Sequence, residues 1–270
     1  MGSMRALVIR EYVPRRPSLE VAVSHALVER ANEGALGLVV RLYRPAPTLA
    51  FGRLDALRPG FAAAAAAARG LGFEPVLRAP GGHAVAYHDG CLGIDEALPE
   101  RDPIAGLQER FAASGELLAE ALRALGVDAR VGRVAGEFCP GDFTVNARGR
   151  VKLVGTAQRV VRHASLLAAS VAVTGGAALR EALTAVYEHL ELDWEPATAG
   201  AVEDDIPGVT LDDIERAVLD AYARRFGLVE ASLDAGTLAL AERLEERHVV
   251  ARRPTSTAPS SPPPPAEVRP

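Results

Sequence analysis

The sequence predicts an α+β fold in which a mixed or antiparallel sheet is flanked by helices. Apolar stretches of strand length recur from residues 5–10 to residues 165–173. Segments with helical periodicity lie between them at irregular intervals, instead of alternating strictly with the strands as in a parallel βαβ sheet. The sequence also contains neither a strand–glycine loop–helix dinucleotide motif nor a Walker-type phosphate loop. Together these observations favour an α+β domain.

Each element is predicted from its own local signal. Residues 18–31 are amphipathic and begin at Ser18, a plausible N-cap, while alanine propensity predicts a helix at 61–69. The helical pattern of 104–125 stops at Gly126. The expected strands are 5–10, 36–43, 48–51, 74–78, 84–87, 143–146, 151–161 and 165–173, and further helices are expected at 177–190, 211–226 and 235–246.

Composition divides the chain into three parts. Residues 4–195 contain all the expected strands and are predicted to form the main domain. After a polar, proline-containing link, the two helices within 208–248 are expected to pair as a small helical lobe. Residues 252–270 are rich in Pro, Ser and Thr and lack apolar periodicity, so we expect disorder there.

Charge and cysteine content argue against several classes of protein. The net charge is −5 and no basic stripe with interleaved aromatic residues is present, so we expect no nucleic-acid binding. No apolar run approaches the ~20 residues of a membrane-spanning helix, and no signal peptide is visible. Two cysteines do not make a disulfide framework in a chain of 270 residues. We therefore expect a cytoplasmic protein without membrane contact.

Lysine usage indicates one candidate functional residue. The chain has 30 Lys and Arg residues, of which Lys152 is the sole lysine. Arginine provides surface charge equally well, whereas lysine is a compact ammonium whose pKa can fall and which can act as a point charge. Arg148 and Gly149 predict a hairpin turn just before it, which places Lys152 near the start of a strand.

Lys152 belongs to one of three clusters of residues suited to chemistry. In its own cluster, residues 149–159, Gly155 leaves open space before the ammonium, and Thr156 and Gln158 offer hydrogen bonds to an acyl carbonyl or an adenylate. A second cluster, residues 137–143, holds Cys139 in a Pro-Gly turn. A thiolate there could be activated by nearby cations, although a small semi-buried hydrophobe would fit the same position.

The remaining cluster, residues 78–90, has two adjacent glycines between expected strands. At Gly81 and Gly82 the backbone can approach a ligand closely, and exposed N–H groups can hold an anion or a carbonyl oxygen. Arg78 could supply a positive charge to a carboxylate or a phosphate. A tight hairpin turn explains the same Pro-Gly-Gly sequence, so both interpretations stay open.

In this order the clusters resemble the cofactor transferases that include lipoate–protein ligases and octanoyltransferases. That family has a lysine-bearing segment of the form GxKxxGxAQ, which reads GRVKLVGTAQ here. Residues 47–53, PTLAFGR, match a family segment PTxxxGR near the acyl pocket, which implies that Phe51 lines that pocket. The resemblance covers roughly residues 5–190 and implies a class II biotin/lipoate ligase-like fold.

Features of two branches of that family are combined in this chain. ATP-dependent ligases usually carry RRxxGGGAVYHD, whereas here Leu77 replaces the first arginine and His83 the third glycine. His88 keeps the ligase-like ending. The segment FCPGD resembles the CPG segment of cysteine-dependent octanoyl amidotransferases, and only Asp142 remains of the asparagine–aspartate pair of the ligases. The balance favours the cysteine enzyme.

The resemblance implies that Cys139 takes an octanoyl or lipoyl group as a thioester, without a cofactor. Lys152 would favour the thiolate and, with N–H groups around Gly81 and Gly82, stabilise the oxyanion. The acceptor would be a lysine of a lipoyl-domain protein, either an E2 subunit of a 2-oxoacid dehydrogenase or the glycine cleavage H protein. Arg78, His83, His88 and Asp142 are expected to contact the substrates.

Two alternatives remain. In an ATP-dependent lipoate–protein ligase, Lys152 would hold the carboxylate and the α-phosphate while an acyl-adenylate forms, with Mg²⁺ neutralising phosphate charge. The chain could instead be a non-catalytic protein that binds acyl chains or lipoyl domains. His83, His88 and His163 lack the spacing of a metal site, so no structural metal is expected in any of these readings. His25, His189 and His248 lie in segments with helical periodicity and are expected at the surface.

Overall fold

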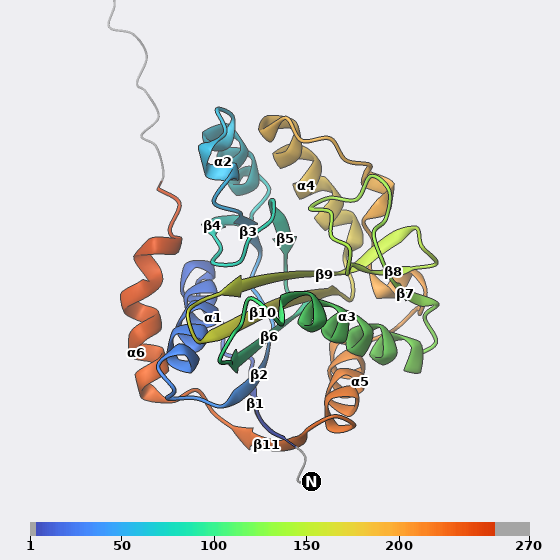
Figure 1. The fold of residues 1–270 in the computed structure, drawn as a ribbon. Coiled ribbons are helices and arrows are strands. Elements are labelled where there is room, and N and C mark those ends of the chain that lie inside the picture. The colour runs from blue at the N-terminus through green and yellow to red at the C-terminus, as the bar shows by residue number, and fades with distance from the viewer. Residues whose placement is uncertain (1–3, 252–270) are drawn as a thin grey trace, which may run out of the picture.

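The computed structural model describes residues 4–251, and its strands form two sheets (Figure 1). The larger sheet has 8 strands in the order β11-β1-β2-β6-β10-β9-β8-β7, and the smaller has 3 in the order β4-β3-β5. In the larger sheet β1 runs parallel to β2 and β11, while the other pairs are antiparallel. The predicted α+β fold with a mixed sheet is confirmed.

The expected elements are present in order with small shifts at their ends, and the structure adds three strands that were not expected: β6, β7 and β11. The strands are β1 (Arg5–Glu11), β2 (Leu38–Tyr43), β3 (Thr48–Phe51), β4 (Glu74–Leu77), β5 (Val85–Tyr87), β6 (Cys91–Pro99), β7 (Ala129–Val131), β8 (Val145–Ala147), β9 (Val151–Val160), β10 (Ala164–Ala172) and β11 (Gly227–Ala231). The helices are α1 (Pro17–Asn32), α2 (Phe61–Gly70), α3 (Leu107–Ala124), α4 (Gly176–Leu190), α5 (Leu211–Ala223) and α6 (Ala235–Leu244).

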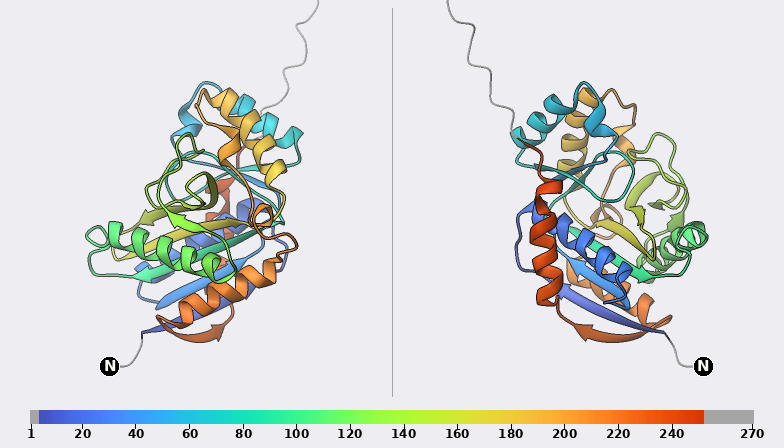
Figure 2. Two further views of the ribbon diagram at one scale, coloured as in Figure 1. Left: turned by 90° about the vertical axis from the view of Figure 1, so that its right-hand side faces the viewer. Right: turned by 60° about the vertical axis from the view of Figure 1, so that its left-hand side comes forward.

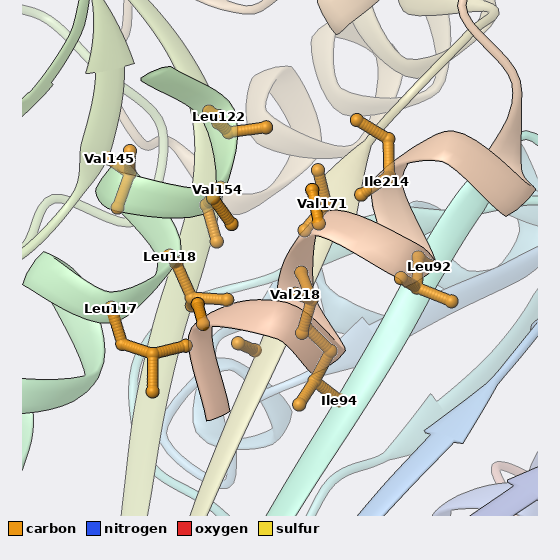
Figure 3. Close-up of a cluster of buried hydrophobic side chains, with 14 of the residues drawn as sticks. Leu92, Ile94, Leu117, Leu118, Leu122, Val145, Val154, Val171, Ile214 and Val218 are labelled. Carbon is orange, nitrogen blue, oxygen red and sulfur yellow. The ribbon is translucent and has the colours of Figure 1, made fainter. Parts of the chain in front are cut away.

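Helices cover both faces of the larger sheet (Figure 2). On one face α3 and α5 pack together over the central strands, with Leu118 and Val218 in the same core as Ile94 of β6 and Val154 of β9 (Figure 3). On the other face α1 lies against β6 and β10, and α6 packs on the outside of α1. These contacts bury an apolar face on each element, which is the main stabilising term for such layers.

The smaller sheet is covered by α2 and α4, which lie above it in Figure 1. Alanines of α2 such as Ala64 and Ala68 are fully buried against Leu183 and Val186 of α4 and Phe51 of β3. Small side chains on α2 let the two helices approach closely. The site described below lies between this sheet and β9.

The chain beyond residue 208 differs from the expected pair of helices. A short strand, β11, lies between α5 and α6 and joins the main sheet beside β1. Each helix packs on the main domain: α5 on α3 and α6 on α1. The segment therefore completes the large sheet instead of forming a lobe of its own. The expected disorder of 252–270 lies outside the described residues.

Two further expectations at α1 need correction. The helix begins at Pro17, whose missing N–H suits the first turn, after Arg16 as N-cap. Ser18, the expected cap, instead donates a hydrogen bond to Glu245, the residue that follows α6. His25 and His248, expected at the surface, are each 1% exposed and contact one another. Both changes come from the C-terminal segment folding back onto α1.

Candidate active site

Cys139 lies in the long loop between β7 and β8, in a backbone conformation that is unusual for its residue type. Its φ is 40°, in the left-handed region that side chains rarely adopt. The cysteine N–H donates a 2.8 Å hydrogen bond to the hydroxyl of Tyr187 on α4, and that hydroxyl donates in turn to the carbonyl of Ala84 at 3.0 Å. Tyr187 therefore joins the cysteine loop to the loop that precedes β5.

The sulfur of Cys139 receives hydrogen bonds from the glycine-rich loop between β4 and β5. The backbone N–H of His83 lies 3.2 Å from Sγ, and Nη2 of Arg78 lies 3.5 Å from it. Arg78 also donates to the His83 carbonyl at 2.9 Å, which holds the loop in place. A guanidinium and an amide N–H directed at a sulfur atom are groups that can donate hydrogen bonds to a thiolate.

Gly82 makes this close approach possible. A Cβ atom added there would lie 2.8 Å from the sulfur and 2.6 Å from Nη2 of Arg78, and its φ of +92° already disfavours other residues. Gly82 therefore has no tolerable substitute at this position. The close approach occurs at Gly82 alone, because a Cβ atom added at Gly81 would meet nothing within 4 Å.

Lys152 occupies the second position of β9, as the hairpin turn predicts, and its ammonium is 3% exposed. Its Nζ lies 2.9 Å from the Glu137 carboxylate and donates to the carbonyls of Phe138 and Cys139 at 3.0 and 2.8 Å. Burial lowers the pKa of Lys152, while the charge of Glu137 acts in the opposite direction. The ammonium thus anchors the cysteine loop, and the donors to the sulfur are Arg78 and His83.

Glu137 is the functional residue that sequence reasoning missed. Its carboxylate is fully shielded and accepts hydrogen bonds from the Thr144 hydroxyl at 2.8 Å and the Val134 N–H at 3.2 Å, besides pairing with Lys152. A buried carboxylate needs such partners to stay ionised. Its sequence neighbours did not identify it, because the loop meets the sole lysine only in the folded protein.

Two cavities meet at Cys139. The inner cavity is apolar and lies between β9 and β10 of the large sheet, β5 of the small sheet and α4; its lining includes Val85, Ala86, Leu153, Gly155, Ala168, Ala172, Leu179 and Leu183. The outer cleft is open and is lined by Gly81, Gly82, Gln108, Phe111, Asp142, Phe143 and Gln158. Cys139 and Thr156 line both, so the thiol lies where an apolar chain and a solvent-borne partner can meet.

Most of the predicted site residues gather around these cavities. Arg78, Gly81, Gly82, Cys139, Asp142, Lys152, Gly155, Thr156 and Gln158 all line one or both of them. The amide of Gln158 already accepts from Arg110 and donates to the Leu107 carbonyl, so it braces α3. Asp142 is exposed and pairs with Arg133 at 3.0 Å.

Three predicted residues line neither cavity: His83, described below, His88 and Phe51. His88 is 8% exposed at the β5–β6 turn, where Nδ1 accepts the Gly90 N–H at 2.8 Å. It therefore shapes the turn. Phe51 is fully buried in the core of the small sheet, with its ring centroid 5.0 Å from that of Phe61. Cys91, buried in β6, contributes to the inner cavity wall, and burial raises its pKa to about 12.

The side chain of His83 pairs with the carboxylate of Asp55. Its Nδ1 lies 2.8 Å from Oδ1 of Asp55, whose side chain is fully shielded. The other oxygen of Asp55 accepts the Gly52 N–H at 3.0 Å. Asp55 belongs to the short 3₁₀ turn Asp55–Leu57, which follows β3. The pair thus connects the end of β3 to the glycine-rich loop.

Within residues 4–251, no three His, Cys, Asp or Glu side chains are grouped so that they could hold a metal ion. No helix of that range has the length and apolar content needed to cross a membrane.

The fold matches that of solved structures. It is shared with a putative lipoate protein ligase from T. acidophilum with bound lipoic acid, at a TM-score of 0.73 and 20% identity over 90% of this chain and 96% of that one. A lipoate-protein ligase A bound with ATP is similar, with a TM-score of 0.70 and 20% identity over 90% of this chain and 95% of the other.

Sequence comparison identifies the family. The chain belongs to the family of the lipoyl protein ligase A/B catalytic domain, whose model matches residues 16–221. Among curated relatives, an octanoyl-[GcvH]:protein N-octanoyltransferase of Geobacillus kaustophilus is 30% identical over 168 residues, which is 62% of this chain. The match spans 59% of the length of that relative.

Proposed function

We propose that this protein transfers an octanoyl or lipoyl group to a lysine of a lipoyl-domain protein through a thioester at Cys139. The observation that carries the proposal is the position of the sulfur, which lines both the apolar inner cavity and the open outer cleft. An acyl chain in the inner cavity would present its carbonyl at the sulfur, and a carrier lysine would reach it through the outer cleft. Relatives named octanoyl-[GcvH]:protein N-octanoyltransferases support this assignment.

The chemistry follows from the groups around the sulfur. The thiolate of Cys139, which faces Arg78 and the His83 N–H, attacks the amide carbonyl of an acylated carrier lysine. The C–S bond of the thioester forms, the amide C–N bond breaks, and the donor lysine leaves as an amine after taking a proton from water. The same donors then face the sulfur as it leaves, when the carrier lysine attacks the thioester. Lys152 holds the loop through the carbonyls on either side of the Phe138–Cys139 bond, so that the thiol stays aimed at both cavities.

The arrangement of cations favours this route over acyl-adenylate formation. A triphosphate needs several free positive charges or a metal to neutralise it. Here Arg78 is engaged by the sulfur and the His83 carbonyl, and Lys152 by Glu137 and two carbonyls. These cations are therefore not free to neutralise the phosphates of ATP. No step of the proposed reaction uses ATP or Mg²⁺.

The partners in this proposal are a donor carrier with an octanoylated or lipoylated lysine and an acceptor carrier with an unmodified lysine. The names of the relatives indicate the glycine cleavage H protein as donor, and E2 subunits of 2-oxoacid dehydrogenases are the expected acceptors. We place the reaction in the cytoplasm, since Cys91 and Cys139 are both free thiols and the chemistry requires Cys139 reduced.

Intact mass spectrometry tests the proposal. The protein is incubated with an octanoylated carrier domain without ATP, and we expect a hydroxylamine-labile octanoyl adduct that maps to Cys139. A Cys139→Ala variant should form no adduct and transfer no acyl group, whereas Cys91→Ala should keep both. Full transfer by Cys139→Ala, or adenylate formation from ATP with octanoate or lipoate, would contradict the thioester route.

A further inference from the structure

The second step of the proposed transfer needs a group that accepts a proton from the carrier lysine. A carrier lysine arrives as an ammonium, and it must lose a proton before its nitrogen can attack the thioester. The cations beside Cys139 cannot take that proton. Arg78 stays protonated in proteins, and each of the three N–H donors of Lys152 has an acceptor, namely the carboxylate of Glu137 and two carbonyls.

The Asp55–His83 pair provides a base in this position. Because the Asp55 carboxylate can only accept at Nδ1, that nitrogen carries the imidazole proton and Nε2 bears the lone pair. Within residues 4–251 no group hydrogen-bonds to Nε2. The His83 side chain is 34% exposed, so a solvent-borne amine has access to the ring.

His83 is also the residue whose backbone contacts the sulfur. The N–H of His83 itself contacts the sulfur at 3.2 Å, so the ring is attached to the residue that touches the thioester position. Asp55 is buried and held by the Gly52 N–H, which limits how far the ring can turn away. A lone pair oriented by a buried carboxylate is the arrangement that serves as general base in hydrolytic triads.

We propose that His83, oriented by Asp55, is the general base that deprotonates the acceptor lysine; the inference rests on the proposed thioester at Cys139. Nε2 takes one proton from the lysine ammonium and becomes an imidazolium. The amine lone pair then forms the C–N bond at the thioester carbonyl. As the tetrahedral intermediate collapses, the C–S bond breaks and the sulfur leaves as a thiolate facing Arg78. The second nitrogen proton goes to that thiolate, and His83 returns its proton to water.

The assignment also gives His83 a purpose specific to this chain. In a nucleotide-binding glycine loop a side chain at this position would obstruct the phosphates. In a thioester enzyme the same side chain can serve the second half-reaction, which uses no nucleotide. His83 is thus expected to act after the acyl-enzyme has formed.

The test measures transfer from preformed octanoyl-enzyme in a single turnover. General-base catalysis contributes about 10²–10⁴-fold, so His83→Gln should slow transfer to a carrier lysine by about 100-fold. Asp55→Asn should slow it less, because Nε2 remains but its tautomer and orientation are lost. Hydroxylamine is already neutral at the assay pH, so His83→Gln should release octanoyl to it at close to the parent rate. Imidazole added to His83→Ala should partly restore transfer to the carrier lysine.

Controls separate this inference from the proposed function. His163→Gln changes an exposed histidine at the β9–β10 turn and should transfer at the parent rate. If the parent protein forms no octanoyl-enzyme, the proposed function itself fails. If octanoyl-enzyme forms but His83→Gln transfers to lysine at the parent rate, His83 is not the base. An equal loss with lysine and hydroxylamine would assign His83 a role in loop geometry alone and overturn the inference.

Discussion

Lys152 and Glu137 form an ion pair of 2.9 Å whose side chains are 3% and 0% exposed. Each therefore depends on the other to remain charged in the protein interior. Their connection also extends to the backbone, because Lys152 holds two carbonyls of the cysteine loop and Glu137 accepts N–H and O–H groups from the same loop. The pair therefore stabilises the cysteine loop and holds it in position at the site.

Removing one partner should cost stability as well as activity. Lys152→Met leaves a buried carboxylate without its cation, and breaking such a pair costs roughly 3–5 kcal/mol. We expect Glu137→Gln to be destabilising as well, and the double variant to lose far less than the sum of the two single losses. Urea unfolding of the four proteins measures this coupling. Losses that simply add would show that the two side chains do not interact.

The Tyr187 hydroxyl should matter for catalysis through the cysteine backbone. Tyr187→Phe leaves the Cys139 N–H and the Ala84 carbonyl without their partner, and a buried unsatisfied group costs roughly 1–3 kcal/mol. The left-handed conformation of Cys139 then loses one of its restraints. We expect a lower unfolding midpoint and a several-fold lower rate of octanoyl-enzyme formation. Thr184→Val, on an exposed position of α4, is the control and should change neither.

The buried histidine pair should make stability depend on pH. Burial lowers the pKa of His25 to about 4, and the neighbouring His248 and the charges of Arg159, Arg247 and Arg53 add to this effect. The unfolded chain then binds more protons than the native protein between pH ~6.5 and about 4, so stability is full above that range and falls as the pH drops through it. The slope is up to ~1.4 kcal/mol per pH unit.

Urea unfolding at several pH values checks this expectation. His25→Gln should have lower stability at neutral pH but a flatter dependence on pH. His189→Gln, at an exposed position of α4, should keep the parent slope. A parent slope that persists in His25→Gln would mean that other groups titrate.

Acyl-chain length should depend on the small residues of the inner cavity. Ala168 of β10 lines that cavity, and a leucine there would occupy space that a chain of eight carbons needs. Ala168→Leu should therefore lower octanoyl-enzyme formation by about tenfold or more, while a butyryl donor is still accepted. Overpacking of a well-packed site costs ~1–3 kcal/mol, so the unfolding midpoint is measured alongside. An unchanged chain-length profile would place the acyl chain elsewhere.

Local signals predicted much of the fold and part of the site. Arg148 and Gly149 both adopt positive φ, at 57° and 71°, so the expected hairpin forms and Lys152 follows it on β9. The Pro-Gly-Gly turn and the Pro-Gly turn after Cys139 likewise predicted loops, and the structure brings these loops together. Their meeting is a tertiary event, but the chemistry of each loop was readable from its own residues.

What sequence reasoning missed depends on contacts between distant segments. Glu137 is an acidic residue in a polar loop, and nothing near it in sequence indicates that Lys152 will cover it. His25 lies on an amphipathic helix and is buried only because His248 and its neighbours fold over α1. Phe51 lies in a family-like segment, but its side chain faces the small sheet's core, where Phe61 covers it.

The parallel pairing of β1 with β11 has a consequence for how the chain folds. Arg5 lies opposite Gly227 in register, so β1 gains its outer neighbour only after the distant segment Gly227–Ala231 has been made. Until then one edge of β1 presents unpaired N–H and C=O groups, which are open to pairing with strands of other chains. Contacts of such long sequence separation also form slowly. Chains that terminate before residue 227 should therefore aggregate during translation, and newly made protein should depend on chaperones that shield this edge.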